Sequence, residues 1–139
     1  MSGSFTFPVR VYWEDTDAGG IVYYANYLRF MERARTELLR SFGIHQNQLA
    51  KDEGVMFAIV SVSIDYLLPA RLDDLLMITC RIMAEGRASF AFSQDVYRER
   101  VGGELLTRAR TRAACLDCAT LRPRRLPATL LEAIAKHEG

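Results

Sequence analysis

The sequence is nearly without net charge. Its 139 residues carry 18 lysines and arginines against 17 aspartates and glutamates, which leaves a formal charge of +1 at pH 7. No overall field attracts nucleic acid or an anionic membrane, so any basic binding site must be local. Long apolar runs are missing too: none approaches the ~20 residues that span a bilayer, so no integral membrane segment is expected. The first four residues, Met1–Ser4, lack the basic start and apolar stretch of a signal peptide.

Cysteine and histidine are scarce. Three cysteines, an odd number, fit a reduced cytoplasmic compartment better than a disulfide framework. Cys115 and Cys118 have the spacing of a metal-binding pair, but residues three apart on a strand point to opposite faces, so packing roles are expected and no metal site. The histidines, His45 and His137, belong to no ligand-like pattern and are expected at the surface. A serine-nucleophile elbow and a glycine-rich phosphate loop are both missing from the sequence.

What the sequence does contain is the composition of one globular domain. Half of the residues are hydrophobic and a quarter are charged, proportions that argue against disorder. A chain of this length can bury a sizeable core. No repeat, low-complexity segment or linker divides it, so residues 1–139 are expected to form a single domain.

Two helices are expected, the first from its apolar periodicity. Over Asn26–Phe42, apolar residues recur every three or four positions, which is typical of one face of an amphipathic helix of about 25 Å. That face carries Tyr27, Phe30, Met31, Ala34, Leu38 and Phe42. Gly43 is a natural end for this helix. Residues Thr129–His137 are expected to form a short closing helix.

A period of two predicts the strands. The first is expected over Phe5–Trp13, which is rich in aromatic and β-branched residues. From Phe57 onward one strand face collects Ala58, Val60, Val62, Ile64, Tyr66 and Leu68. Two further strands carry the alternating sets Leu76, Ile78, Cys80, Ile82 and Phe90, Phe92. A last strand spans Leu105–Cys118, after a turn at Gly102-Gly103.

Together these elements predict an α+β fold. Four successive strands with short connections favour antiparallel neighbours, and only one long helix is available to cover them. Three of the strands exceed the usual length of about five or six residues, which favours a curved sheet wrapped around that helix. The other face of the sheet then needs a cover, so self-association is expected.

An acidic stretch, Glu14-Asp15-Thr16-Asp17, follows the first strand and precedes Gly19-Gly20. Carboxylates at a strand end beside flexible backbone can face a substrate, where one acts as a general base or a nucleophile. For an isolated acidic turn, a solvated turn or helix cap is the better interpretation. Here the chain runs directly into the long helix, whose first amides lack partners and carry positive potential. Such amides stabilise charge developing on a thioester oxygen, so the stretch predicts an acyl-transfer site.

The run VRVYWEDTDAGGIVYYANY, from Val9 to Tyr27, together with Glu32-Arg33-Ala34-Arg35, closely resembles the 4-hydroxybenzoyl-CoA thioesterase family. Within that family the best match is the YbgC branch, which is associated with the Tol-Pal system. Further similarity lies at Tyr66–Asp74 and Arg124–Pro127, so the resemblance covers nearly the whole chain. It implies a hot-dog fold, in which an antiparallel sheet wraps a central helix and subunits pair edge to edge, commonly as dimers of dimers.

The resemblance also implies an acyl-CoA thioesterase. Its catalytic carboxylate would be Asp17, as nucleophile or general base, and backbone amides from Gly20 to Tyr24, above all that of Tyr24, would polarise the thioester carbonyl. The YbgC branch typically has histidine where this chain has Tyr24, a difference that concerns substrate preference more than the reaction. The neighbouring candidates for substrate binding are Val22, Tyr23, Asn26 and Tyr27, although core packing is the better interpretation of Tyr27.

Coenzyme A enters only as part of the substrate, and no separate cofactor is expected. Its phosphates call for basic residues. The candidates are Arg87, in a turn, and a cluster before the last helix formed by Arg122, Arg124 and Arg125; they could act from the same chain or a neighbouring subunit. The alternative is a solvated basic loop. A further set, Arg108, Arg110 and Arg112, alternates along one strand face and is expected to be exposed or to form interface pairs.

Three other functions compete. The strand ending in Asp15-Thr16-Asp17 faintly resembles the aspartyl-phosphate motif of haloacid-dehalogenase-type phosphatases, but that fold alternates strands and helices. A hot-dog dehydratase or hydratase typically uses a catalytic histidine, and none lies near the helix start. The third alternative is non-enzymatic: a hot-dog module that binds acyl-CoA or acyl-carrier protein and is linked to the Tol-Pal envelope system.

Overall fold

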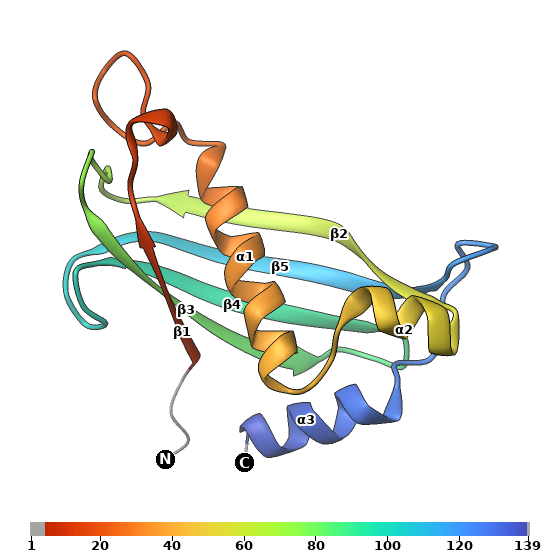
Figure 1. The fold of residues 1–139 in the computed structure, drawn as a ribbon. Helices are drawn as coiled ribbons and strands as arrows, with labels where there is room; N and C mark the ends of the chain where they lie inside the picture. The colour runs from red at the N-terminus through yellow and green to blue at the C-terminus, as the bar shows by residue number, and fades with distance from the viewer. Residues whose placement is uncertain (1–4, 139) are drawn as a thin grey trace.

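The computed structural model describes residues 5–138, so the expectation drawn from Met1–Ser4 lies outside the described residues. Its elements, labelled in Figure 1, are five strands and three α-helices, with one 3-10 turn at Trp13–Asp15. The strands are β1 (Phe5–Arg10), β2 (Val55–Tyr66), β3 (Leu75–Ala84), β4 (Ser89–Arg98) and β5 (Leu105–Asp117). The helices are α1 (Asn26–Ser41), α2 (Gln46–Glu53) and α3 (Ala128–Glu138). The α+β class is confirmed.

All five strands form one antiparallel sheet in the order β1-β3-β4-β5-β2. Sequential neighbours therefore pair only from β3 to β5, and the prediction that β2 lies beside β3 is wrong. Instead β2 pairs with β5 along its whole length, from Val55 opposite Asp117 to Tyr66 opposite Thr107. Residues 67–74 cross the end of the sheet to reach β3. Strands β1 and β2 are thus the two edges.

The long helix α1 lies against one face of the sheet, as Figure 1 shows. Its apolar stripe, buried against the sheet, is Tyr27, Phe30, Met31, Ala34, Leu38 and Leu39. The inner positions of β3 and β4, from Leu76 to Ile82 and from Phe90 to Val96, supply the opposing layer. The predicted helix period and start are confirmed, and its end differs by one residue. Burial of this stripe fixes where the helix begins, and with it the position of the preceding loop.

Three local features depart from the expectations. The first strand ends at Arg10, because the chain turns into the 3-10 turn at Trp13–Asp15. Helix α2 was not expected: it is short and polar, with Leu49 as its buried residue. In β2 the register shifts between Ile59 and Ser61, so Ala58 does not share a face with Val62. A bulge of this kind reverses the alternation of faces and cannot be read from a period of two.

The outer edge of the sheet at β2 is long and apolar. Ile59, Val60 and Val62 are 49%, 55% and 43% exposed. A twelve-residue strand with one unpaired side offers a row of backbone donors and acceptors to another strand. On the face turned away from α1, the arginines of β5 form exposed ion pairs as expected: Arg108 with Asp95, and Arg110 and Arg112 with Glu85.

The cysteines are all free thiols. Cys80 and Cys115 are buried in the core, which agrees with the packing role expected for Cys115. Cys118 is exposed, so the packing role expected for it is wrong. Burial raises the pKa of the Cys80 thiol to about 12, so it stays protonated at neutral pH. His137 is half-buried with its ring 5.7 Å from that of Phe42, whereas His45 is exposed as expected. Within residues 5–138, every helix is too short or too polar to cross a bilayer.

Substituting Phe30 tests the central packing. Phe30 is fully buried under the sheet. Because truncation leaves a cavity that the core cannot fill, Phe30→Ala should lower the free energy of unfolding by about 3–5 kcal/mol in a denaturant titration. Arg33→Ala, on the exposed side of the same helix, should change it by about 0.5 kcal/mol or less. Equal losses for the two variants would contradict the assignment of the buried face.

Candidate active site

The loop between β1 and α1 folds into a small hairpin with Asp17 at its tip. Thr16 and Val22 form an isolated antiparallel bridge, and inside it the Asp17 amide donates to the Ile21 carbonyl at 2.9 Å. The turn closes when the Gly20 amide donates to the Asp17 carbonyl at 3.0 Å, with Gly20 at a φ of +79° that favours glycine. This turn presents the Asp17 side chain at the surface of the chain.

The Asp17 carboxylate keeps one oxygen free. Its Oδ1 accepts from the Gly19 amide at 2.8 Å, which orients the group. Its Oδ2 has no hydrogen-bond partner among residues 5–138. An oriented carboxylate with one free oxygen is equipped to accept a proton from water or to attack an electrophile.

The other acidic residue of the hairpin, Asp15, is occupied by the loop itself. Its Oδ2 accepts from the Tyr12 amide at 2.8 Å. Its backbone carbonyl accepts from the Tyr23 amide at 3.0 Å and from Nδ2 of Asn26 at 2.9 Å. The side chain of Asn26, a predicted substrate contact, therefore ties the start of α1 to the hairpin. Asp15 and Asn26 position the loop that carries Asp17.

Two of the five expected amides, those of Ile21 and Tyr24, donate to no acceptor in the described part of the chain. The amides of Gly20, Val22 and Tyr23 donate to backbone carbonyls, so Gly20 is not available as the oxyanion donor that the sequence suggested. The amides of Tyr24 and Ala25 have no acceptor in the described part of the chain. They precede the first turn of α1, where the helix dipole adds positive potential. Of the two free amides in the expected Gly20–Tyr24 run, only that of Tyr24 lies at the entrance of α1.

An apolar pocket of about 310 Å³ opens beside this entrance. Its lining comes from the hairpin, from the start of α1 and from the segment after β2: Ile21, Val22, Tyr24, Tyr27, Tyr66, Leu67, Leu68 and Pro69. Of the predicted binding residues, Val22 and Tyr27 line it, whereas Tyr23 is exposed beside it with its ring 4.9 Å from that of Tyr24. Residues 66–69 were not predicted to contact substrate, although they belong to a stretch that resembles the family.

Tyr27 and Tyr66 connect the pocket to the core. The buried Tyr27 hydroxyl accepts from the Ala70 amide at 3.1 Å, and burial raises the pKa of that phenol. The Tyr27 and Tyr66 rings meet edge to face, with centroids 5.5 Å apart. The Tyr66 hydroxyl donates to the Tyr24 carbonyl at 3.0 Å. These contacts hold the peptide unit at the helix entrance, and Tyr27 serves both the core and the pocket.

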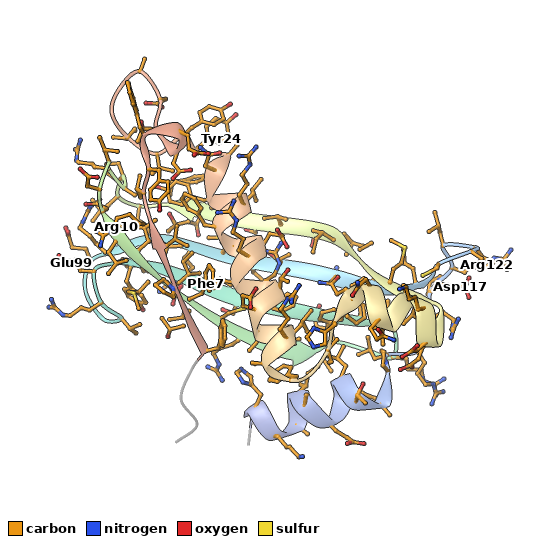
Figure 2. All side chains as sticks on the ribbon, in the orientation of Figure 1. Phe7, Arg10, Tyr24, Glu99, Asp117 and Arg122 are labelled. Carbon is orange, nitrogen blue, oxygen red and sulfur yellow. The ribbon has the colours of Figure 1, made fainter. Side chains whose placement is uncertain are left out.

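The predicted phosphate-binding arginines lie at the other end of the sheet. The loop that carries Asp17 follows β1, whose last residue, Arg10, pairs with Leu75. This is the end of the sheet at which β2 ends with Tyr66. Arg87 lies between β3 and β4, and the cluster of Arg122, Arg124 and Arg125 follows β5, all at the opposite end. Figure 2 shows Tyr24 and Arg122 far apart on the molecule. A single chain therefore does not bring these arginines to Asp17.

The four arginines do lie near one another. The Leu126 amide donates to the Arg87 carbonyl at 2.8 Å, which joins the turn to the cluster. Arg124 is engaged locally, with Nη1 2.7 Å from Asp117 Oδ2. Arg87, Arg122 and Arg125 are exposed. Among residues 5–138, no group of three His, Cys, Asp or Glu side chains is placed to hold a metal ion.

Comparison with known proteins identifies the family. Residues 11–134 match the model of the thioesterase-like superfamily. This chain belongs to the thioesterase-like superfamily. An acyl-CoA thioesterase YbgC from Haemophilus influenzae is 41% identical over 127 residues, which cover 91% of each protein. The resemblance to YbgC proteins is thereby confirmed, as is the class of enzyme, a thioester hydrolase.

Solved structures of thioesterases share the fold. A 1,4-dihydroxy-2-naphthoyl-CoA thioesterase from Synechocystis superposes with a TM-score of 0.90 at 26% identity, over 99% of each chain. A 4-hydroxybenzoyl CoA thioesterase mutant, complexed with 4-hydroxybenzoyl CoA, gives a TM-score of 0.85 at 29% identity, over 94% of this chain and 98% of that one. The predicted hot-dog thioesterase fold is thus confirmed in its architecture.

Substituting Tyr66 tests its hydrogen bond to the Tyr24 carbonyl, with thioester hydrolysis as the assay. Tyr66→Phe removes the hydroxyl that fixes the Tyr24 carbonyl, and loss of one neutral hydrogen bond should lower kcat by about 3–10-fold. KM should stay within about twofold, because the contact is expected to position an N–H donor that acts in the transition state. Tyr97→Phe, on the opposite face of the sheet, is the control. An unchanged kcat in Tyr66→Phe would show that this bond does not position the site.

Proposed function

We propose that this chain hydrolyses the thioester of small acyl-CoA substrates at the Asp17 hairpin. The observation that carries the proposal is the free Tyr24 amide at the entrance of α1, beside an apolar pocket and the hairpin that presents Asp17. A carbonyl oxygen bound by that amide would have its developing negative charge stabilised by the N–H group and the helix dipole. The acyl chain would then occupy the apolar pocket.

Two routes are open to the carboxylate. As a general base, Asp17 takes a proton from water; the resulting hydroxide adds to the carbonyl carbon, and the C–S bond breaks as the thiolate leaves and is protonated. As a nucleophile, Asp17 displaces the thiolate to form a mixed anhydride, which water then hydrolyses to free acid and carboxylate. In both routes the Tyr24 amide binds the same oxyanion, and neither route needs a metal.

Pairing of two chains through β2 would complete the site. When two copies of one strand pair antiparallel about their midpoint, the end of each lies beside the start of the other. The Tyr66 end of one chain would then lie beside the Val55 end of its partner, which carries the Arg122, Arg124 and Arg125 cluster. This arrangement would bring basic residues from one subunit to the Asp17 hairpin of the other, where coenzyme A phosphates need them. Association of such dimers through the outer sheet face would give the predicted dimer of dimers.

The relatives indicate which classes of acyl-CoA substrate to consider. Their names cover general acyl-CoA, 4-hydroxybenzoyl-CoA and dihydroxynaphthoyl-CoA substrates. An acyl group delivered on acyl-carrier protein would present the same thioester to the site. With tyrosine in place of the branch-typical histidine at position 24, the proposed reaction uses a backbone amide and a carboxylate, without an imidazole. Binding of acyl-CoA without release of free thiol would instead favour the non-catalytic module of the Tol-Pal system.

Replacing the carboxylate is the direct test. Asp17→Asn should lower kcat at least ~100-fold, because the amide neither accepts the proton nor attacks the carbonyl. The measurement is thiol release across short, long and aromatic acyl-CoAs, with circular dichroism and chromatography to show an unchanged fold and oligomer. Glu14→Gln, in the 3-10 turn just before the hairpin, should keep activity within about threefold of wild type. Wild-type turnover by Asp17→Asn would overturn the proposed function.

Introducing a charged side chain on β2 tests the proposed interface. Val62→Asp places an unpaired carboxylate on the exposed apolar edge, which a paired strand would bury at high cost. Light scattering should then report monomers where the wild type forms dimers. Leu131→Asp, on the exposed side of α3, is the matched control and should leave the dimer intact. A Val62→Asp variant that remains dimeric would place the interface elsewhere.

A further inference from the structure

A second cavity lies between α1 and the far half of the sheet. Its volume is about 180 Å³, and it shares no lining residue with the pocket beside Tyr24. The wall from α1 is partly polar, whereas the wall from the sheet is aromatic and aliphatic. The lining comprises Glu32, Arg35, Thr36, Leu39, Gln46, Phe57, Ile59, Phe90, Phe92 and Ala113.

Arg35 brings a positive charge to this cavity, where the carboxylate of Glu32 attracts it electrostatically but forms no ion pair with it. Its Nη1 donates to Oε1 of Gln94 at 3.2 Å, and its guanidinium carbon lies 5.8 Å from the centre of the Phe92 ring. Among the described residues, no carboxylate forms an ion pair with it. The nearest acid along the helix, Glu32, accepts from Thr36 Oγ1 at 2.6 Å.

The partner of Arg35 is itself fixed in the core. Gln94 is only 1% exposed, and its Nε2 donates to the Met31 carbonyl at 3.0 Å. That bond turns the amide oxygen of Gln94 toward the guanidinium, so the direction of Arg35 is set by a buried group. A neutral oxygen and a ring face offset only part of the cost of desolvating a cation. Burial accordingly lowers the pKa of Arg35. A guanidinium has five donors, and most of those on Arg35 remain for a ligand.

The distances favour the partner's active site over the chain's own. Arg35 lies eleven positions after Tyr24, so at 1.5 Å per residue the helix places them ~16 Å apart, too far for a small acyl group. Across the proposed β2 interface the geometry differs. Phe57 and Ile59 line the cavity near the start of β2, and antiparallel pairing would bring the Tyr66 end of the partner's β2 beside them. The partner's acyl pocket and this cavity would then adjoin.

We propose that the Arg35 cavity binds the far end of the acyl group held by the partner subunit, and that the preferred acyl group ends in a carboxylate. This inference rests on the proposed thioester hydrolysis and adds the class of substrate. The carboxylate would form the ion pair that Arg35 lacks among the described residues, with charge-assisted hydrogen bonds from Arg35. The methylenes before it would contact Phe57 and Phe92.

The first test compares acyl-CoAs that differ at their far end. Wild-type kcat/KM should be about 10- to 100-fold higher for glutaryl-CoA than for valeryl-CoA, the factor expected from a charge-assisted hydrogen bond. A ratio near one, with both substrates hydrolysed, would overturn the inference and leave the proposed function standing. Hydrolysis of neither would overturn the proposed function. Calorimetric titration of Asp17→Asn with the same two compounds gives a readout independent of turnover, and equal affinities would also overturn the inference.

The second test assigns the preference to Arg35. Arg35→Met should bring the glutaryl-to-valeryl ratio close to one, and Arg35→Lys should restore part of it, because an ammonium keeps the charge but loses the fork geometry. Arg33→Met, exposed on the same helix, should keep the wild-type ratio. If Arg35→Met does not fold, the glutaryl-to-valeryl ratios of the wild type and of Arg35→Lys still test the inference. A wild-type ratio in Arg35→Met would show that another group selects the substrate.

Discussion

Six side chains of α1 are removed from water against the sheet, and the positions of the helix entrance and of Arg35 follow from that contact. Because the stripe begins at Tyr27, the first turn of the helix is anchored and the unpaired amides just before it point to a fixed place. Tyr27 also accepts from the Ala70 amide, which locks the segment that forms the far wall of the pocket. The same helix carries Arg35 two to three turns further on, so one packed surface positions both cavities.

Much of this architecture could be predicted because it depends on local periodicity. The apolar spacing from Tyr27 to Leu38 identified α1, and alternation identified each strand within a few residues. The partner of β2 could not be predicted, since alternation specifies which face is buried but not which neighbour supplies the hydrogen bonds. Helix α2 was not predicted, because its polar sequence buries only Leu49 and therefore has almost no amphipathic pattern.

The same distinction between local pattern and long-range contact applies to the candidate site. The motif around Asp17 is continuous in sequence, so its glycines and its junction with α1 could be predicted from the residues alone. The bond from Tyr66 to Tyr24 joins residues 42 positions apart, and only the fold brings them together. The arginines could not be placed from the sequence: their chemistry suits phosphates, but they lie at the end of the sheet away from Asp17. Sequence indicates which groups suit coenzyme A phosphates but not where the fold places those groups.

The uncovered edge of β2 has a consequence for how the protein behaves on dilution. In the dimer proposed through this edge, neither chain would have a complete site alone, so specific activity would follow the fraction of chains that are paired. That fraction would obey mass action, and the midpoint of thermal unfolding would rise with protein concentration for the same reason. The amount of protein would then act as a control on its rate, one that requires no effector and no chemical modification.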